Sequence, residues 1–167
     1  VSAPYVDNAR GASYVLFGKS SSRDTYLASL NSSDGVALMG SAESVKSGFI
    51  VSGVGDVNGD GLLDFAIGEP EAHSKIKGAV RVIFGCTNNC YNEIDLNDLS
   101  SHGFSILGPS NYAKIGTAIS AAGDINGDGY DDIVVSSFLA NNLEGVAYVI
   151  YGGAAPVSVD LAFLDKS

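Results

Sequence analysis

The feature that most constrains this fold is an internal repeat with a period of 67 to 68 residues. A Gly-bounded run of small, branched and aromatic residues occurs three times, and a shorter run ending in Gly and a loop rich in Asp, Asn and Gly each occur twice. The Gly-bounded run occupies residues 11–18, 78–85 and 145–152. The shorter run occupies 35–40 and 103–108, and the loop occupies 56–64 and 124–132. A constant period of this length indicates a fold built from one repeated supersecondary unit.

Each repeat is predicted to contain four β-strands. Short runs rich in Val, Ile and aromatic residues, broken by Gly, favour strands over helices. The Gly-bounded run is the third strand of the repeat. The other predicted strands are the first, rich in small residues, at 48–55 and 116–123; the second at 63–68 and 132–136; and the fourth at 36–40 and 104–108.

The third strand is apolar on both of its faces. In the copy at 78–85, Val80, Val82 and Phe84 lie on one face, and Ala79 and Ile83 lie on the other. A strand of this kind must be covered on both sides. Four-stranded sheets stacked face to face around an axis provide that cover, so the predicted fold class is all-β, a β-propeller of four-stranded blades.

The repeat divides the chain into about two and a half blades. Residues 1–45 are predicted to form a partial first blade, 46–112 a complete blade with the loop 56–64, and 113–167 a blade with the loop 124–132 that lacks its last strand. Closed propellers usually have about four to eight blades. The remaining blades are expected from the same longer polypeptide or from other copies in an oligomer or filament.

The two Asp- and Asn-rich loops predict calcium sites, because both follow the pattern D-x-N-x-D-G-x-x-D. Ca²⁺ takes about six to eight oxygen ligands from carboxylates, amides and backbone carbonyls. In each loop the predicted ligands are three Asp side chains, one Asn side chain and one backbone carbonyl, that of Leu62 or Tyr130. The full set is Asp56, Asn58, Asp60, Leu62 and Asp64, then Asp124, Asn126, Asp128, Tyr130 and Asp132. The expected cofactor is two Ca²⁺ ions.

Two other structures could in principle contain loops of this composition. An EF-hand needs a bidentate Glu at loop position 12 and a helix on each side, but position 12 is Ile67 or Val135 and the flanking runs are strand-like. A hairpin turn without metal is the second alternative. Three carboxylates within nine residues repel one another unless a cation is present, which favours the calcium site.

Net charge and hydropathy argue against two classes of partner, nucleic acids and the interior of a membrane. A formal charge of −10 at pH 7 argues against nucleic acid, and two Ca²⁺ ions, adding four positive charges, would bring it to −6. No apolar run approaches the roughly 18 residues of a membrane span. No signal peptide is visible at Val1, as expected of a mature or trimmed segment of a secreted protein.

The two cysteines, Cys86 and Cys90, predict a small loop disulfide in an oxidising compartment. Their spacing is not that of a redox or zinc motif, and no His lies nearby. Two free thiols are the alternative. The stretch lengthens one connection within a repeat relative to its counterparts, so we expect it on an exposed loop.

The repeat resembles the FG-GAP repeats of integrin α-subunit β-propellers and of many bacterial and protist surface proteins. The calcium loops match at every ligand position and the Gly-bounded strand matches three times. The Phe-Gly of the motif appears only as Ser47-Gly48 and Ile115-Gly116. Its Gly-Ala-Pro appears as Ser2-Ala3-Pro4, Gly68-Glu69-Pro70 and, with a clear departure, Ser136-Ser137-Phe138.

This resemblance implies a seven-bladed propeller with structural calcium in the loops between the first and second strands. It implies a secreted or cell-surface protein used for adhesion, recognition or assembly. The protein or glycan ligand does not transfer with the resemblance, because family members bind many partners through variable loops.

No enzymatic motif is present, so the chain is expected not to be an enzyme. The acidic residues outside the loops, such as Glu69, Glu71, Asp95 and Asp98, are expected to be solvated turn residues. The alternative function is an accessory propeller part of a larger secreted enzyme, such as a phospholipase or another hydrolase.

Overall fold

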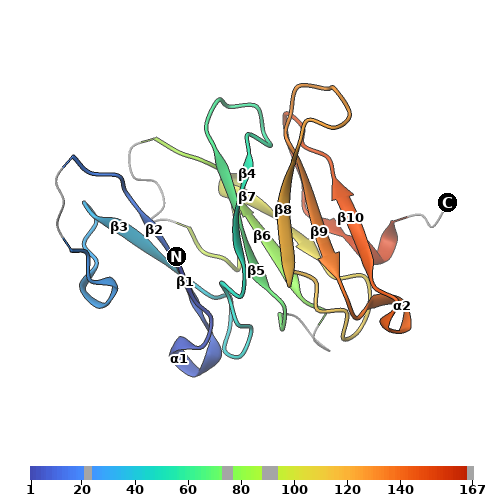
Figure 1. The fold of residues 1–167 in the computed structure, drawn as a ribbon, viewed down its shortest axis with the longest axis horizontal. Coiled ribbons are helices and arrows are strands. Elements are labelled where there is room, and N and C mark those ends of the chain that lie inside the picture. The colour runs from blue at the N-terminus through green and yellow to red at the C-terminus, as the bar shows by residue number, and fades with distance from the viewer. Residues whose placement is uncertain (21–23, 73–76, 88–93, 165–167) are drawn as a thin grey trace.

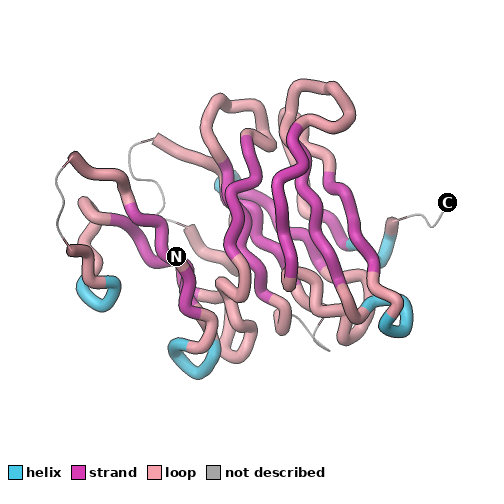
Figure 2. The backbone as a smooth tube through the Cα atoms, viewed as in Figure 1, coloured by secondary structure: helices cyan, strands magenta, loops and turns pink. Residues whose placement is uncertain are grey.

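The computed structural model describes residues 1–20, 24–72, 77–87 and 94–164, and it is mostly β (Figure 1). The described strands form three sheets that stand side by side, and short helical turns lie between the strands and after the last one (Figure 2). None of the described helices is long and apolar enough to cross a membrane.

The sheets follow the order of the repeats. The N-terminal sheet has the order β1-β2-β3, with β1 Ser2–Ala3, β2 Ala12–Leu16 and β3 Gly35–Met39. The central sheet has the order β11-β7-β6-β5-β4, with β4 Val51–Gly55, β5 Asp64–Glu69, β6 Ala79–Ile83, β7 Gly103–Leu107 and β11 Val159–Asp160. The C-terminal sheet has the order β10-β9-β8, with β8 Ala118–Gly123, β9 Asp132–Ser137 and β10 Val146–Ile150.

Helical structure is limited to single turns. The described turns are α1 Val6–Ala9, α2 Ala140–Leu143 and the 3₁₀ turns Leu27–Ser29, Ser100–His102 and Leu161–Phe163. Every one of them lies between strands or after the last strand, and Leu161 of the last turn belongs to a buried hydrophobic cluster.

The predicted strand order is confirmed in the central sheet, where β4, β5, β6 and β7 pair antiparallel with their neighbours in sequence. The first strand starts later than predicted, at Val51 rather than Gly48. The cause is a turn over 46–49, in which the N–H of Phe49 donates to the carbonyl of Lys46 at 3.1 Å. The pattern of Gly and β-branched residues thus located each strand to within a few residues.

The short strand β11 was not predicted. It pairs in parallel with β7, matching Val159 to Ile106 and Asp160 to Leu107. A segment of the last predicted blade therefore adds an outer strand to the central sheet, and this contact ties consecutive repeats together.

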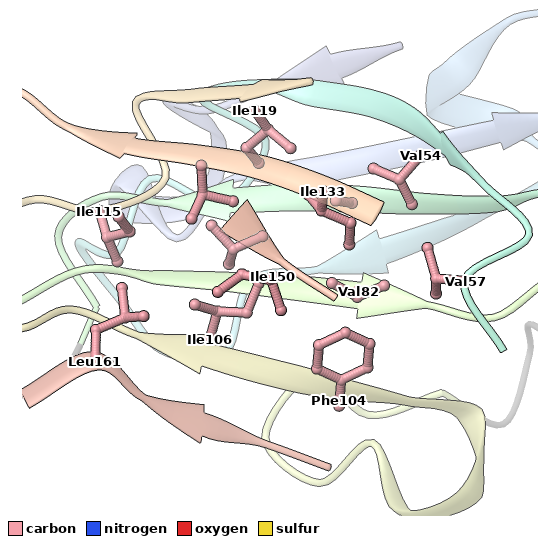
Figure 3. Close-up of a cluster of buried hydrophobic side chains, with 13 residues drawn as sticks. Val54, Val57, Val82, Phe104, Ile106, Ile115, Ile119, Ile133, Ile150 and Leu161 are labelled. Carbon is pink, nitrogen blue, oxygen red and sulfur yellow. The ribbon is translucent and has the colours of Figure 1, made fainter. Parts of the chain in front are cut away.

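The central sheet is covered on both faces, as the composition of its third strand predicts. All five residues of β6 are buried. Val80 and Val82 belong to a cluster that also contains residues of β8, β9 and β10 (Figure 3). Ile83 belongs to a second cluster with Leu38 of the N-terminal sheet. Burial of each such side chain contributes about 1.5–3 kcal/mol, so these two clusters hold the three sheets together.

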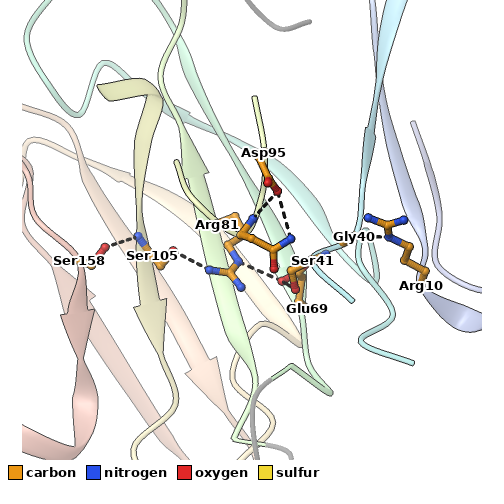
Figure 4. Close-up of polar contacts among 9 residues, drawn as sticks. Arg10, Gly40, Ser41, Glu69, Arg81, Asp95, Ser105 and Ser158 are labelled. Carbon is orange, nitrogen blue, oxygen red and sulfur yellow. Dashed lines mark hydrogen bonds and ion pairs between the residues drawn. The ribbon is translucent and has the colours of Figure 1, made fainter. Parts of the chain in front are cut away.

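A buried ion pair lies within the central sheet, where the sequence predicted a solvated Glu69. That prediction is wrong, because Glu69 is 0% exposed and its Oε2 accepts from Arg81 Nε at 2.9 Å. The same carboxylate accepts from the backbone N–H and the hydroxyl of Ser41, at 2.9 and 2.8 Å. Arg81 Nη1 donates to the Ser105 hydroxyl at 2.8 Å (Figure 4). The network joins β5, β6 and β7 to the segment after β3.

The other acidic residues named from the sequence differ in their surroundings. Asp95 and Asp98 are exposed, as expected. Glu71 is partly buried and accepts from Lys46 at 2.8 Å and from Lys114 at 3.2 Å. Hydrogen bonding from Lys46 is the main cause that lowers the pKa of Glu71. The two lysines lie at equivalent positions of successive repeats, so Glu71 joins the turns that precede β4 and β8.

Candidate metal centre

The two predicted calcium loops connect β4 to β5 and β8 to β9. Both loops lie at the same end of neighbouring sheets, at the top of the view in Figure 1. The inner strands β4 and β8 pack against each other, which brings the two loops side by side.

The first loop is closed by its first residue, Asp56. Asp56 Oδ1 accepts from the N–H groups of Gly59 at 2.8 Å and Asp60 at 3.1 Å, and Oδ2 accepts from Gly61 N–H at 2.8 Å. One carboxylate thus gathers three consecutive backbone donors and fixes the turn.

In the middle of the first loop, the side chains of Asn58 and Asp60 each accept from a backbone N–H two residues later. Asn58 Oδ1 accepts from Asp60 N–H at 3.1 Å, and Asn58 Nδ2 donates to Asp60 Oδ2 at 2.9 Å. Asp60 Oδ1 accepts from the N–H of Leu62 at 2.8 Å. Asn58 and Asp60 are therefore held next to each other on the exposed side of the loop.

The last predicted ligand, Asp64, is buried at the start of β5. Its Oδ2 accepts from Val57 N–H at 2.8 Å and its Oδ1 accepts from Gly85 N–H at 2.6 Å. Burial raises the pKa of the Asp64 carboxyl, the donors Gly85 and Val57 lower it, and the charges of Asp60 and Asp56 raise it again. The negative charges of Asp60 and Asp56 thus act on Asp64 across the loop.

The second loop has the same hydrogen bonds at the equivalent positions. Asp124 accepts from Gly127 at 2.7 Å, Asp128 at 3.0 Å and Gly129 at 2.8 Å. These donors, Gly129 first, lower the pKa of the Asp124 carboxyl. The remaining pairs are Asn126 with Asp128, Asp128 with the N–H of Tyr130, and Asp132 with the N–H groups of Ile125 and Gly152.

The donor set of each loop fits a hard dication. Each loop has three Asp side chains and one Asn side chain at its predicted ligand positions. An ionised carboxylate has about four lone-pair sites, so oxygens that already accept backbone N–H groups can also bind a cation. In their present arrangement, no group of three or more His, Cys, Asp or Glu side chains among the described residues converges as a metal site. The ten-residue ligand assignment stays a prediction.

The predicted disulfide cannot be followed in the same way, because Cys90 lies outside the described residues. The pairing of Cys86 with Cys90 also stays a prediction.

Sequence reasoning missed a direct contact between the two loops. Asp131, which precedes the last predicted ligand of the second loop, accepts from Asp56 N–H through Oδ2 at 2.8 Å. Its own N–H donates to the carbonyl of Asp56 at 3.0 Å. A signal was present in the sequence, since the equivalent residue of the first loop is the apolar Leu63.

The chain matches a model of the FG-GAP repeat over residues 48–83 and 116–150. Each match begins at a Gly two or three residues before the first strand, includes the loop and ends at the last residue of the third strand. The two loops and the strands around them are thus the part of the chain that carries the family pattern.

Several integrin chains are similar to this chain. Integrin alpha-8 of Gallus gallus is 32% identical over 136 residues, which cover 77% of this chain and 12% of that protein. Integrin alpha-4 of Xenopus laevis is 30% identical over 99 residues, 58% of this chain and 9% of that protein. Integrin alpha pat-2 of Caenorhabditis elegans is 28% identical over 136 residues, 79% of this chain and 11% of that protein.

The chain spans between 9% and 12% of the length of these relatives. The chain therefore contains FG-GAP repeats and is distantly similar to integrin alpha chains.

Proposed function

We propose that this chain is a non-catalytic, calcium-stabilised part of a β-propeller, used for adhesion, recognition or assembly. The observation that carries the proposal is the identity of the two loops, which share the ligand spacing and the same hydrogen bonds at each position. FG-GAP repeats often bind Ca²⁺, and the donor types fit that ion.

The propeller part of the proposal is supported by the arrangement of the sheets. They stand side by side in repeat order, and both faces of the central sheet are buried by its neighbours. The exposed outer faces of the first and last sheets would be covered in the same way by further blades. Those blades would come from the same longer polypeptide or from other copies of the chain.

Calcium would act on the folded state through the loop carboxylates. The predicted ligands in each loop are the side chains at positions 1, 3, 5 and 9, with the carbonyl of Leu62 or Tyr130 at position 7. Burial is the main cause of the raised pKa of Asp64, and the charges of Asp60 and Asp56 add to it. A bound ion would offset these charges and would join the ends of the first and second strands. An extracellular site needs only a Kd of about 10⁻⁴–10⁻³ M.

The location and role follow from the relatives as part of the same proposal. Integrin alpha chains are cell-surface proteins, which supports a secreted or cell-surface location. The proposal assigns no catalytic role to Glu69 or Glu71, because the buried Glu69 is paired with Arg81 and the partly buried Glu71 is paired with Lys46 and Lys114. A catalytic domain in the same open reading frame would instead favour an accessory part of an enzyme.

We expect calcium to raise the thermal stability of the chain. Saturation at about a hundred times Kd adds about 2.7 kcal/mol for each site that binds only the folded state. For a chain of this size each kcal/mol raises Tm by about 2–4 °C. Differential scanning calorimetry in excess calcium and in excess EGTA measures the difference.

Two alanine variants and a titration with magnesium show whether the gain in thermal stability comes from calcium bound in these two loops. Asp56→Ala and Asp124→Ala should each remove one of two bound ions, as counted by equilibrium dialysis. Magnesium should stabilise less, because it demands near-octahedral geometry and gives up water reluctantly. A melting curve that is the same in calcium and in EGTA would refute the proposal.

A further inference from the structure

Equivalent glycines that precede the two loops have different surroundings. Gly55 and Gly123 both have a left-handed backbone, with φ of +87° and +67°. A Cβ atom at Gly55 would overlap the carboxylate of Asp131, whereas one at Gly123 would meet no atom within 4 Å. Asp131 therefore occupies the space beside the first loop that a side chain at Gly55 would fill.

The residue before Asp131 also contacts the first loop. A Cβ atom added at Gly59 would lie 2.5 Å from Cε1 of Tyr130, while one added at the equivalent Gly127 would meet nothing within 4 Å. The Tyr130 ring thus lies against the turn of the first loop. The carbonyl of Tyr130 and the carboxylate of Asp132 are predicted ligands of the second loop. The side chains of Tyr130 and Asp131 contact the first loop, so the segment 130–132 connects the two loops.

A second connection joins the last predicted ligands of the two loops. Asp132 Oδ1 accepts from Gly152 N–H at 2.9 Å. The N–H of the next residue, Gly153, donates to the carbonyl of Val57 at 2.9 Å. The N–H of Val57 in turn donates to Asp64 Oδ2 at 2.8 Å. A displacement of Asp132 would therefore also displace Asp64, through this chain of hydrogen bonds.

We infer that the two loops form one coupled calcium-binding unit, in which calcium in the second loop raises the affinity of the first. The inference rests on the proposed function. When Tyr130 and Asp132 hold an ion, the backbone on both sides of Asp131 is fixed, and Asp131 is held against Asp56. The first loop then binds calcium with a smaller loss of conformational entropy. Linkage requires the first loop to raise the affinity of the second by the same factor.

Two charge effects act on this coupling in opposite directions. Repulsion between two bound dications weakens it, but charges in exposed loops are screened over about 8–10 Å at physiological ionic strength. The Asp131 carboxylate accepts from the backbone N–H of Asp56, a predicted ligand of the first loop. An ion in the second loop that holds Asp131 in this place also holds its negative charge beside the first loop, which strengthens the coupling. The coupling is therefore expected to be positive.

The test compares the calcium affinity of each loop when the other is intact or disabled. Calcium is titrated into the 167-residue chain, and the amide NMR signals of Gly61 and Gly129 follow the two loops separately. We expect Asp124→Ala to weaken binding at the first loop by about fivefold or more, within the usual range of coupling between sites. Asp56→Ala should weaken the second loop by the same factor.

Substitutions at Asp131 identify the contact responsible. Asp131→Leu gives the second loop the residue that the first loop has at this position, and it should abolish the effect of Asp124→Ala on the first loop. Asp131→Asn keeps an acceptor for Asp56 N–H and should retain the coupling. Leu63→Asn is the matched control, because Leu63 is 80% exposed, and it should leave the coupling unchanged.

A pair of glycine variants keeps the test decisive if Asp131→Leu does not fold. Gly55→Ala and Gly123→Ala meet similar left-handed strain, but only the first displaces Asp131. Loss of coupling in Gly55→Ala alone supports the inference. Equal or tighter calcium binding by the first loop in Asp124→Ala overturns the coupling and leaves two independent calcium sites. An absence of binding at both loops overturns the proposed function and the coupling together.

Discussion

Replacement of Glu69 by alanine is expected to lower the free energy of unfolding by about 3–5 kcal/mol, because it leaves Arg81 buried without its carboxylate partner. Arg81 is only 6% exposed, and its Nε lies 2.9 Å from Glu69. The change also removes the acceptor for two donors of Ser41, so it weakens the link between the N-terminal and central sheets. In a chain of this size Tm should fall by about 6–20 °C, as measured by calorimetry.

Two controls separate the buried pair from a general effect of removing a carboxylate. Glu43→Ala removes an exposed carboxylate and should change stability by no more than about 0.5 kcal/mol. The double variant Glu69→Leu with Arg81→Met leaves no buried charge unpaired and should be more stable than Glu69→Ala. A Glu69→Ala protein that melts with the wild type would show that this network does not hold the sheets together.

Replacement of Asp132 by alanine is expected to destabilise the chain by about 3 kcal/mol even in EGTA. Asp132 is 0% exposed and accepts from the N–H groups of Ile125 at 3.0 Å and Gly152 at 2.9 Å. A hydrogen bond to a charged group contributes about 1.5–3 kcal/mol, and both donors would lose their partner. The loss of two such bonds should lower Tm by about 6–12 °C, measured by thermal unfolding followed with circular dichroism.

Asp128→Ala is the matched control for this prediction, because Asp128 is an exposed predicted ligand of the same loop. In EGTA it should cost much less stability than Asp132→Ala. In excess calcium both variants should lack the ion of the second loop. If the two variants were equally stable in EGTA, the buried carboxylate would have no structural role separate from metal binding.

Much of the fold could be predicted because Gly and β-branched residues locate the strands. The strand with Val80 and Val82 on one face and Ile83 on the other required cover on both sides, and the structure provides it. The short strand Val159–Asp160 was missed because two residues carry no periodic pattern. Its existence depends on the partner strand β7, which lies in the preceding repeat.

The burial of Glu69 was missed for a different reason. The sequence Gly68-Glu69-Pro70 is typical of a turn, and local composition does not show which neighbour a side chain meets. A signal was available in the partner, since Arg81 stands in an apolar strand where the other two copies have Tyr14 and Tyr148. A charged residue in that place requires a buried carboxylate to pair with it.

At the candidate site, too, the sequence predicted local structure but not the contacts between repeats. The spacing of Asp and Asn predicted which residues share a loop, and the structure gives both loops the same hydrogen bonds. Comparison of one repeat with the next did not reveal the contact between Asp131 and Asp56, because that contact joins two repeats. Such contacts come from the packing of neighbouring sheets, which the period alone does not specify.

The most direct test of the calcium hypothesis is a crystal structure of the 167-residue chain grown in millimolar calcium. We predict one ion in each loop, with oxygen contacts of about 2.3–2.6 Å from the three Asp side chains, the Asn side chain and the carbonyl of Leu62 or Tyr130. Loops that contain only water under these conditions, with each carboxylate still bonded to backbone N–H groups alone, would contradict it.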